Sequence, residues 1–282
     1  MKITKEVRDL IDRALAEDLS IGDPTTDILI PPDMESTAAL LAKEDGVLAG
    51  LDVGLEAFRR LDSRMATTPL MKDGASIRAG DHLGTIEGSV ASLLKAERTA
   101  VNFMRHMSGI ATETRRYVQA VDGYQARIVD TRKTTPGLRF LEKYSVRMGG
   151  GQNHRYNLGD GILIKDNHID ALRSDGLSLG DVVKKAIRHA SHTIRVEVEV
   201  ESLEQLEEAL DAGAEFVLLD NMDFEQMAEA VRVAKGKAFT EASGGITLET
   251  VRAVAATGVD IISVGALTHS VRALDISMDM LD

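Results

Sequence analysis

The 282-residue chain contains no cysteine, which excludes disulfides, thiolate catalysis and zinc–thiolate sites. It also has no apolar run near the ~18 residues that cross a bilayer, so we expect no membrane span. Residues 1–7 mix charged with apolar side chains and offer neither an apolar signal core nor a cleavage site, so a cytoplasmic location is expected. Basic residues are in deficit, and the net charge of −12 argues against nucleic acid as the main partner. A small anionic substrate is not excluded, and in an acidic protein a local cluster of cations is more informative.

What the first hundred residues do contain is a mixture of helices and strands without a regular repeat. Val7, Leu10, Ile11, Ala14 and Leu15 follow the i, i+3, i+4 spacing of one buried helical face. Residues 22–26, with the sequence Gly-Asp-Pro-Thr-Thr, are predicted to form a loop. The other expected elements are strands at 37–42, 47–51 and 84–87, and helices at 53–61 and 92–121, the latter broken at Ser108-Gly109. This part is therefore predicted to be α+β.

From about residue 127 the pattern becomes a regular alternation of strands and helices. Short strands are expected at 126–130, 161–164, 194–200, 215–219, 237–242 and 260–264. Helical patterns separate several of them, at 179–190, 203–212, 224–233 and 248–256. Alternating βα units predict parallel strands, and several in succession predict a barrel.

Polar residues recur at the predicted carboxyl ends of successive strands. Glu199, Asp220, Glu241 and Ser263 follow one another at intervals of 21, 21 and 22 residues. In βα barrels the active site lies at this end, where a carboxylate is costly unless a cation, metal or ligand hydroxyl meets it. Asp220, followed by Asn221, has the alternative role of capping the next helix. Glu199 lies on a strand whose valines and glutamates alternate, which favours a functional position.

Cations gather in loops at the same predicted edge. Residues 130–137, Asp-Thr-Arg-Lys-Thr-Thr-Pro-Gly, place Arg132 and Lys133 beside Thr131 and two further hydroxyls in a turn suited to a carboxylate or phosphate. Three glycines at 149–151 run into Asn153, His154 and Arg155, which is typical of a close approach to a ligand. Lys165 ends the next strand. His154 could bind the ligand or could be an ordinary hydrogen-bonded histidine. For His168 we prefer the second interpretation.

Small residues follow the last two strands and predict a phosphate-binding cradle. The two candidate turns contain Ser243, Gly244 and Gly245, and Val264, Gly265 and Ala266. A ribose 5-phosphate would place its phosphate there and its hydroxyls on Glu199 and Asp220. Mg²⁺ would join these acids indirectly, through a pyrophosphate group.

These motifs resemble the quinolinate phosphoribosyltransferase family. The resemblance rests on residues 97–103, 108–112, 130–137, 149–155, 163–169, 196–201, 219–221, 241–246 and 263–270, in the family's order. It implies an α/β fold with an N-terminal α/β sandwich at residues 1–108 and an incomplete, TIM-like α/β barrel at 109–270. It also implies that a tail, 271–282, packs back on the N-terminal domain.

The resemblance further implies transfer of a phosphoribosyl group from phosphoribosyl pyrophosphate to quinolinate with decarboxylation, a reaction of de novo NAD biosynthesis. Thr131, Arg132, Lys133, His154, Arg155 and Lys165 match residues that grip quinolinate and phosphate groups. Glu199 and Asp220 match the acids on the ribose side, and these two with Lys133 and Lys165 are the expected catalytic residues. Arg98 matches an arginine that reaches the partner's active site in a homodimer.

Two alternatives stay open at this point. One is a related phosphoribosyltransferase that acts on nicotinate or another aromatic acid, although a substrate with one carboxylate would need fewer cations. The other is a non-catalytic barrel that binds sugar phosphates, which would retain the glycine pair without Arg132 and Arg155. Fold alone does not separate them, because barrels host unrelated functions.

Overall fold

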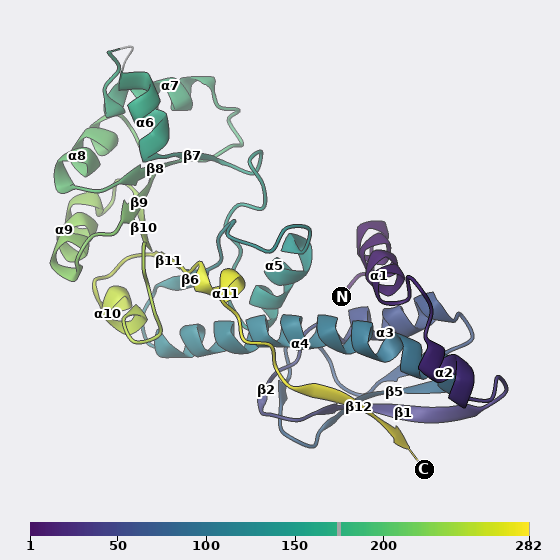
Figure 1. Ribbon diagram of the computed structural model, residues 1–282. Helices are drawn as coiled ribbons and strands as arrows, with labels where there is room; N and C mark the ends of the chain where they lie inside the picture. Colours follow the sequence, from purple (N-terminus) through teal and green to yellow (C-terminus); the bar gives the residue numbers. More distant parts are fainter. Residues whose placement is uncertain (174–175, 282) are drawn as a thin grey trace. The chain divides into compact units, whose positions relative to one another are not determined.

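The chain forms two compact units in a computed structural model that describes residues 1–173 and 176–281 (Figure 1). Unit 1 comprises Met1–Arg115, Phe140–Gly150 and Val271–Asp282, and unit 2 comprises Arg116–Arg139 and Gly151–Ser270. The predicted α/β class, with parallel strands in one part and a separate mixed part, is confirmed. No helix among the described residues is long and apolar enough to cross a membrane.

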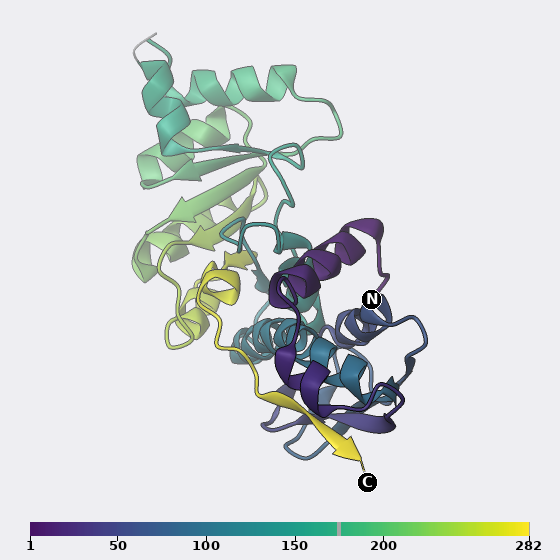
Figure 2. The same cartoon turned by 45° about the vertical axis from the view of Figure 1, so that its right-hand side comes forward.

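Unit 1 is built on an antiparallel sheet with the strand order β12-β1-β5-β3, and β2 pairs separately with β4. Its elements are α1 (Lys5–Asp18), α2 (Pro24–Leu29), β1 (Glu35–Ala42), β2 (Gly46–Val47), α3 (Leu51–Leu61), β3 (Ala66–Pro69), β4 (Ser76–Ile77), β5 (His82–Ser89), most of α4 (Val90–Ala120), α5 (Arg139–Met148) and β12 (Ile276–Leu281). The last strand lies beside β1, far from it in sequence (Figure 2). Fully buried side chains such as Leu40, Phe58 and Ile86 fill the core between sheet and helices.

Two predictions in this unit are wrong. The expected loop at 22–26 gives way to α2, because Asp23 accepts a hydrogen bond from the Thr26 amide and Pro24 occupies the first helical turn. The expected strand at 47–51 is only the two-residue β2, since Gly50 takes a left-handed conformation (φ 86°) and α3 begins at Leu51.

The expected break at Ser108-Gly109 is also absent, and α4 runs without interruption from Val90 to Ala120. The Ser108 hydroxyl accepts a hydrogen bond from the Ala49 amide and donates one to the Ala49 carbonyl. A Cβ at Gly109 would lie 2.3 Å from the carbonyl oxygen of Arg272. These two residues therefore serve close packing against neighbouring segments, and the helix tolerates the cost of an internal glycine, about 1 kcal/mol.

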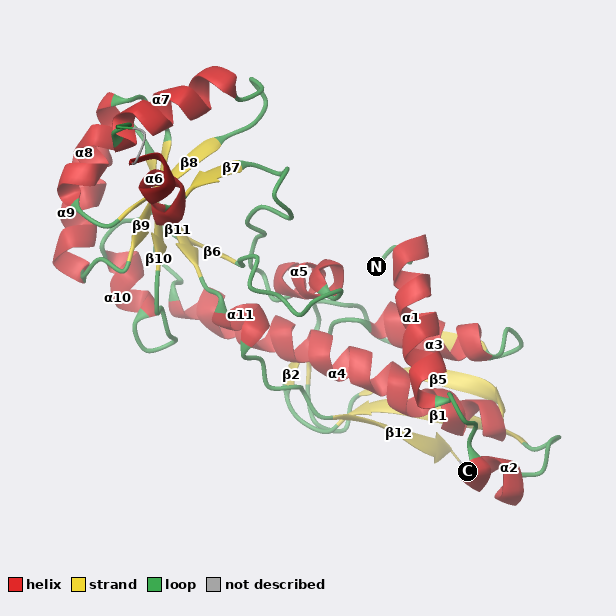
Figure 3. Cartoon of the chain, turned by 45° about the horizontal axis from the view of Figure 1, so that its top comes forward, coloured by secondary structure: helices red, strands yellow, loops and turns green. Residues whose placement is uncertain are grey.

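Unit 2 is a six-stranded parallel sheet with helices outside it (Figure 3). The strand order is β6-β11-β10-β9-β8-β7, so β6 and β7 are the two edges and the barrel is incomplete, as predicted. The elements are β6 (Arg127–Val129), β7 (Ile162–Ile164), α6 (Asp166–Arg173), α7 (Leu179–His189), β8 (Val196–Val200), α8 (Leu203–Asp211), β9 (Phe216–Asp220), α9 (Phe224–Ala234), β10 (Phe239–Ser243), α10 (Val251–Ala256), β11 (Ile261–Ser263) and α11 (Ala266–His269).

Helix caps set the lengths of the βα loops at the carboxyl edge of this sheet. Ser202 caps α8 through the Gln205 amide, and Asp223 forms a capping box with Gln226 at the start of α9. The loop between β8 and α8 is therefore only two residues long, and the loop between β9 and α9 only three. Because the strands are parallel, their last residues meet at one edge, where the predicted acids Glu199 and Asp220 lie.

Candidate functional site

The acids at the carboxyl ends of β8, β9 and β10 differ in burial. Glu199 is 9% exposed and Glu241 3% exposed, whereas Asp220 is half-buried. Parallel pairing places Leu218 beside both Glu199 and Glu241, and Ser243 beside Asp220. The spacing of 21 residues therefore does bring these acids to one edge.

Glu199 has a cationic partner from the neighbouring strand. The Nζ of Lys165, at the end of β7, lies 3.0 Å from the Glu199 Oε2, and the lysine side chain remains 45% exposed. The lysine balances the charge of the buried carboxylate yet stays accessible to a ligand. His168 behaves as an ordinary hydrogen-bonded residue here, because its Nδ1 accepts from the Lys165 amide at 2.9 Å.

Asn221 links Asp220 to the first glycine turn. It is the one non-glycine residue with a positive φ (54°) in the described part of the chain. Its Nδ2 donates to the Asp220 Oδ2 at 2.8 Å, and its amide donates to the Ser243 carbonyl at 3.1 Å. A Cβ at Gly244 would lie 2.2 Å from the Asn221 Oδ1, so only glycine fits there. The sequence reasoning missed Asn221 as a site residue, and a Leu-Asp-Asn string carries no signal of backbone strain.

Arg132 and Arg155 form a pair of cations suited to an anion. Burial, and then the positive charge of Arg132, lower the pKa of the Arg155 guanidinium. The Arg132 Nε is buried without a hydrogen-bond partner among the described residues. Arg155 donates through Nη1 to the Gly161 carbonyl at 3.3 Å. A buried, unsatisfied guanidinium nitrogen beside a second cation is an arrangement that an oxyanion completes.

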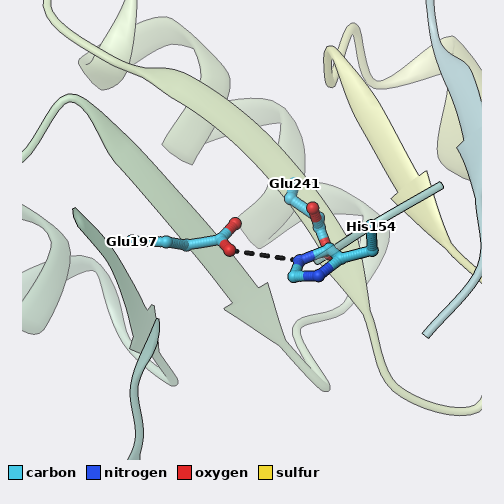
Figure 4. Close-up of side chains that lie close together, drawn as sticks. All are labelled: His154, Glu197 and Glu241. Carbon is cyan, nitrogen blue, oxygen red and sulfur yellow. Dashed lines mark hydrogen bonds and ion pairs between the residues drawn. The ribbon is translucent and has the colours of Figure 1, made fainter. Parts of the chain in front are cut away.

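The His154 ring lies next to two glutamates, Glu197 and Glu241 (Figure 4). Its Nε2 is 3.2 Å from the Glu197 Oε2 and 3.6 Å from the Glu241 Oε1. Burial, and then the charge of Glu197, raise the pKa of Glu241 to about 7. The three side chains each offer one atom that a metal ion accepts, all within 4.8 Å of one another. Glu197 was missed in the sequence, although its alternation with Glu199 on one strand contained the signal.

The loop after β6 meets the second glycine turn. The Lys133 carbonyl accepts from the Thr268 hydroxyl at 2.8 Å, and the Lys133 amide donates to the Thr131 hydroxyl at 3.0 Å. A Cβ at Gly265 would lie 3.2 Å from the Lys133 Cδ. Val264, which precedes this glycine, is buried and donates to the Val129 carbonyl, and Ala266 begins α11. Lys133 and the turn at 264–266 are therefore neighbours.

Arg98 is the predicted site residue that belongs to unit 1. It lies on α4, its side chain is 57% exposed, and its Nη2 is 3.5 Å from the Glu97 Oε1. The remaining predicted residues all belong to unit 2. A pocket of about 1160 Å³ opens at the opposite, amino end of the parallel strands, next to Arg195, Phe216 and Phe239, and none of the predicted site residues lines it.

Comparisons with known proteins cover almost the whole chain. The family models for the N-terminal and C-terminal domains of quinolinate phosphoribosyl transferase match residues 23–108 and 110–279. The chain is 47% identical to the nicotinate-nucleotide pyrophosphorylase [carboxylating] of Mycobacterium leprae, covering 97% of this chain and 96% of that protein. It is 43% identical to a probable enzyme of the same name from Bacillus subtilis, over 98% and 93% of the two chains.

A solved structure agrees with this relationship. The nicotinate-nucleotide pyrophosphorylase of Francisella tularensis superposes with a TM-score of 0.91 at 39% identity, covering 98% of this chain and 96% of that one. Both domain models, both relatives and this fold thus point to one family. The chain belongs to the quinolinate phosphoribosyl transferase family.

Proposed function

We propose that this protein transfers the phosphoribosyl group of phosphoribosyl pyrophosphate to quinolinate and releases carbon dioxide, giving nicotinate mononucleotide and pyrophosphate. The observation that carries the proposal is the pair Arg132 and Arg155, in which one guanidinium nitrogen is buried and unsatisfied. Quinolinate has two adjacent carboxylates, and guanidinium groups are the natural receptor for them. A binding barrel for sugar phosphates alone would have no use for this pair.

Quinolinate is assigned to the cations of unit 2. Arg132 and Arg155 take the two carboxylates, with Thr131, His154, Lys133 and Lys165 completing the ring of polar groups. The accessible Nζ of Lys165 is paired with Glu199, and this supports assigning the lysine to the boundary between quinolinate and the ribose. The positions of Arg132 and Lys133 in one loop support a shared role toward both reactants.

Phosphoribosyl pyrophosphate is assigned to the acids and the two small-residue turns. Glu199 and Asp220 accept hydrogen bonds from the ribose hydroxyls, while the turns at 243–245 and 264–266 hold the 5-phosphate. Mg²⁺ enters as part of the pyrophosphate substrate, and the oxygen donors of Glu199 and Asp220 fit this hard cation indirectly, through the bound substrate. The lysine beside Glu199 argues against a resident metal on that carboxylate.

The chemistry then follows from positions and charges. The ring nitrogen of quinolinate attacks the ribose carbon as pyrophosphate departs, through an oxocarbenium-like state that Glu199 and Asp220 stabilise. The nitrogen gives its electron pair to the new bond and becomes a positively charged pyridinium. That charge stabilises the carbanion left when the 2-carboxylate departs as carbon dioxide, and a proton then fills the vacant ring position. Lys133 and Lys165 are assigned to balance the negative charge that develops in these steps.

We further propose that the active protein is a cytoplasmic homodimer in which Arg98 completes the partner's site. Unit 1 exposes large apolar side chains that a second copy would cover, with Ile21 94%, Ile28 79% and Leu29 69% exposed. The Arg98 side chain is free to extend, since its ion pair with Glu97 is long and exposed.

The proposal is tested by supplying Mg²⁺ and phosphoribosyl pyrophosphate with either quinolinate or nicotinate. Quinolinate should be converted far more efficiently, because nicotinate leaves one guanidinium without its carboxylate. Turnover of nicotinate alone would contradict the proposal.

A further inference from the structure

The His154 ring is held at both nitrogens, and this fixes its tautomer. The Arg155 amide donates to the His154 Nδ1 at 2.8 Å, so this nitrogen must present a lone pair. The ring proton therefore belongs on Nε2, which is 3.2 Å from the Glu197 Oε2 and donates to it. A metal ion on Nε2 would require removal of that proton and would leave an anionic ring. The cluster of His154, Glu197 and Glu241 is consequently built to hold protons rather than a metal.

Glu241 supplies the second part of the cluster. Its Oε1 is buried, lacks a hydrogen-bond partner among the described residues, and lies 3.6 Å from the His154 Nε2. Two adjacent carboxylates with one histidine N–H between them are stable only if one carboxyl group keeps a proton. Glu241 is the more buried of the two glutamates, and burial together with the charge of Glu197 raises its pKa, so Glu241 is the member of the pair that keeps a proton more readily.

The segment that carries Arg155 depends on this ring. The His154 amide donates to the Asp130 Oδ1 at 2.9 Å, and the Asn153 Nδ2 donates to the Asp130 Oδ2 at 2.6 Å. These bonds fix the residues before Arg155. The Arg155 amide donates to the imidazole. The orientation of the ring therefore helps to set the backbone position from which the Arg155 side chain extends.

We propose that Glu197 and Glu241 are positioning residues for the substrate-binding arginine: they hold His154 in the tautomer whose Nδ1 accepts the Arg155 amide. Glu197 accepts a hydrogen bond from the ring N–H. Glu241, in its protonated form, adds no second negative charge next to the ring. Glu197 and Glu241 lie next to the ring, Asp130 accepts hydrogen bonds from the segment that carries it, and Arg132 is close enough for its charge to lower the pKa of Arg155. The inference rests on the proposed role of Arg155 toward a quinolinate carboxylate.

The test compares glutamine with leucine at each glutamate. Glu197→Gln and Glu241→Gln retain an acceptor and a neutral donor, and should keep quinolinate affinity within about threefold of wild type. Glu197→Leu and Glu241→Leu should weaken quinolinate binding about tenfold, as expected for one lost hydrogen bond. Affinity for phosphoribosyl pyrophosphate and turnover at saturating quinolinate should change little, which a general loss of structure would not reproduce.

Nitrogen-15 NMR of the imidazole gives a direct readout of the tautomer. Wild type and both glutamine variants should show His154 protonated at Nε2 and unprotonated at Nδ1, and the leucine variants a mixture. Should a leucine variant fail to fold, the tautomer in the wild type and the glutamine variants still decides. An unprotonated Nε2 in wild type, or stoichiometric Mn²⁺ binding that Glu241→Gln abolishes, would overturn the inference.

Arg155→Ala separates this inference from the proposed function. If Arg155→Ala binds quinolinate normally, the assignment of the arginine is wrong. If it binds poorly while both leucine variants bind normally, the positioning role of the glutamates is wrong and the proposed function stands.

Discussion

In the proposed reaction, single residues at the carboxyl edge of the parallel sheet carry the chemistry, and the arginine pair is the clearest case. Arg132 and Arg155 lie in separate loops, yet burial and then the charge of Arg132 lower the pKa of Arg155. Holding two like charges close together and partly buried destabilises the protein. A bound anionic ligand offsets this destabilisation. Their sequence positions were predictable from the Thr-Arg-Lys-Thr and Asn-His-Arg strings, whereas the buried, unsatisfied Nε required the fold.

Arg132→Ala and Arg155→Ala should each lower catalytic efficiency at low quinolinate about ten- to a hundredfold. The loss of a charge-assisted hydrogen bond to a desolvated carboxylate costs about 1.5–3 kcal/mol, and 1.4 kcal/mol corresponds to a factor of ten. Steady-state kinetics check this, with the exposed Arg188→Ala on α7 as the matched control. Near-normal efficiency in either variant would show that the arginine has another role.

Glu241 should make the free energy of unfolding depend on pH. Its pKa is about 7 in the folded chain and near the ordinary 4.5 when unfolded, so the folded state binds more protons between these values. Stability is therefore lost as the pH rises from 4.5 through 7, by on the order of 3 kcal/mol. Glu241→Gln has no carboxyl group to titrate at this position. The free energy of unfolding of the variant minus that of wild type should therefore increase as the pH rises from 4.5 to 7.

Urea unfolding of both proteins at a series of pH values measures the difference. Glu215→Gln, an exposed position just before β9, is the control and should follow wild type at every pH. Parallel curves for wild type and Glu241→Gln would contradict the raised pKa.

At the scale of elements, the strand ends were predictable and their fine geometry was not. The regular spacing of Glu199, Asp220 and Glu241 located three successive strands, because β8, β9 and β10 are each 5 residues long and the helices between them, α8 and α9, have 9 and 11 residues. The helix break expected at Ser108-Gly109 was wrong, since both residues serve tertiary contacts that sequence periodicity does not contain. The left-handed Asn221 likewise arises from its contacts with Asp220 and the Gly244 turn.

Gly244→Ala should damage this junction far more than Gly245→Ala. Both glycines have positive φ, which costs an alanine roughly 1–2 kcal/mol, but only the Gly244 Cβ would collide with Asn221. A displaced Asn221 releases Asp220, so the KM for phosphoribosyl pyrophosphate should rise at least tenfold in Gly244→Ala. The double variant Gly244→Ala with Asn221→Gly should recover part of the stability, since it removes the colliding side chain.

Thermal unfolding and steady-state kinetics on these variants check the argument. Equal effects of the two alanines would show that the contact between Asn221 and Gly244 is not what fixes the turn.

At the scale of the whole molecule, the proposed homodimer predicts complementation between inactive variants. Arg98→Ala and Arg155→Ala homodimers should each be nearly inactive, because every site lacks one cation. In a mixed dimer one site lacks both cations and the other is complete. Random pairing yields half mixed dimers, so subunit exchange should restore roughly a quarter of wild-type activity.

Exchange must be shown independently, with subunits carrying different tags. Demonstrated exchange without recovery would mean that Arg98 serves its own chain, or no site at all. A surface role for Arg98, paired with Glu97, would be worth at most about 1 kcal/mol.

Product stoichiometry tests the central claim most directly. The account predicts that quinolinate labelled in its 2-carboxylate releases one equivalent of labelled carbon dioxide for each mononucleotide and each pyrophosphate formed, in the presence of Mg²⁺ and phosphoribosyl pyrophosphate. Arg132→Ala should lower all three yields together at low quinolinate. Formation of a mononucleotide that retains the label, or of mononucleotide from nicotinate alone, would contradict the account.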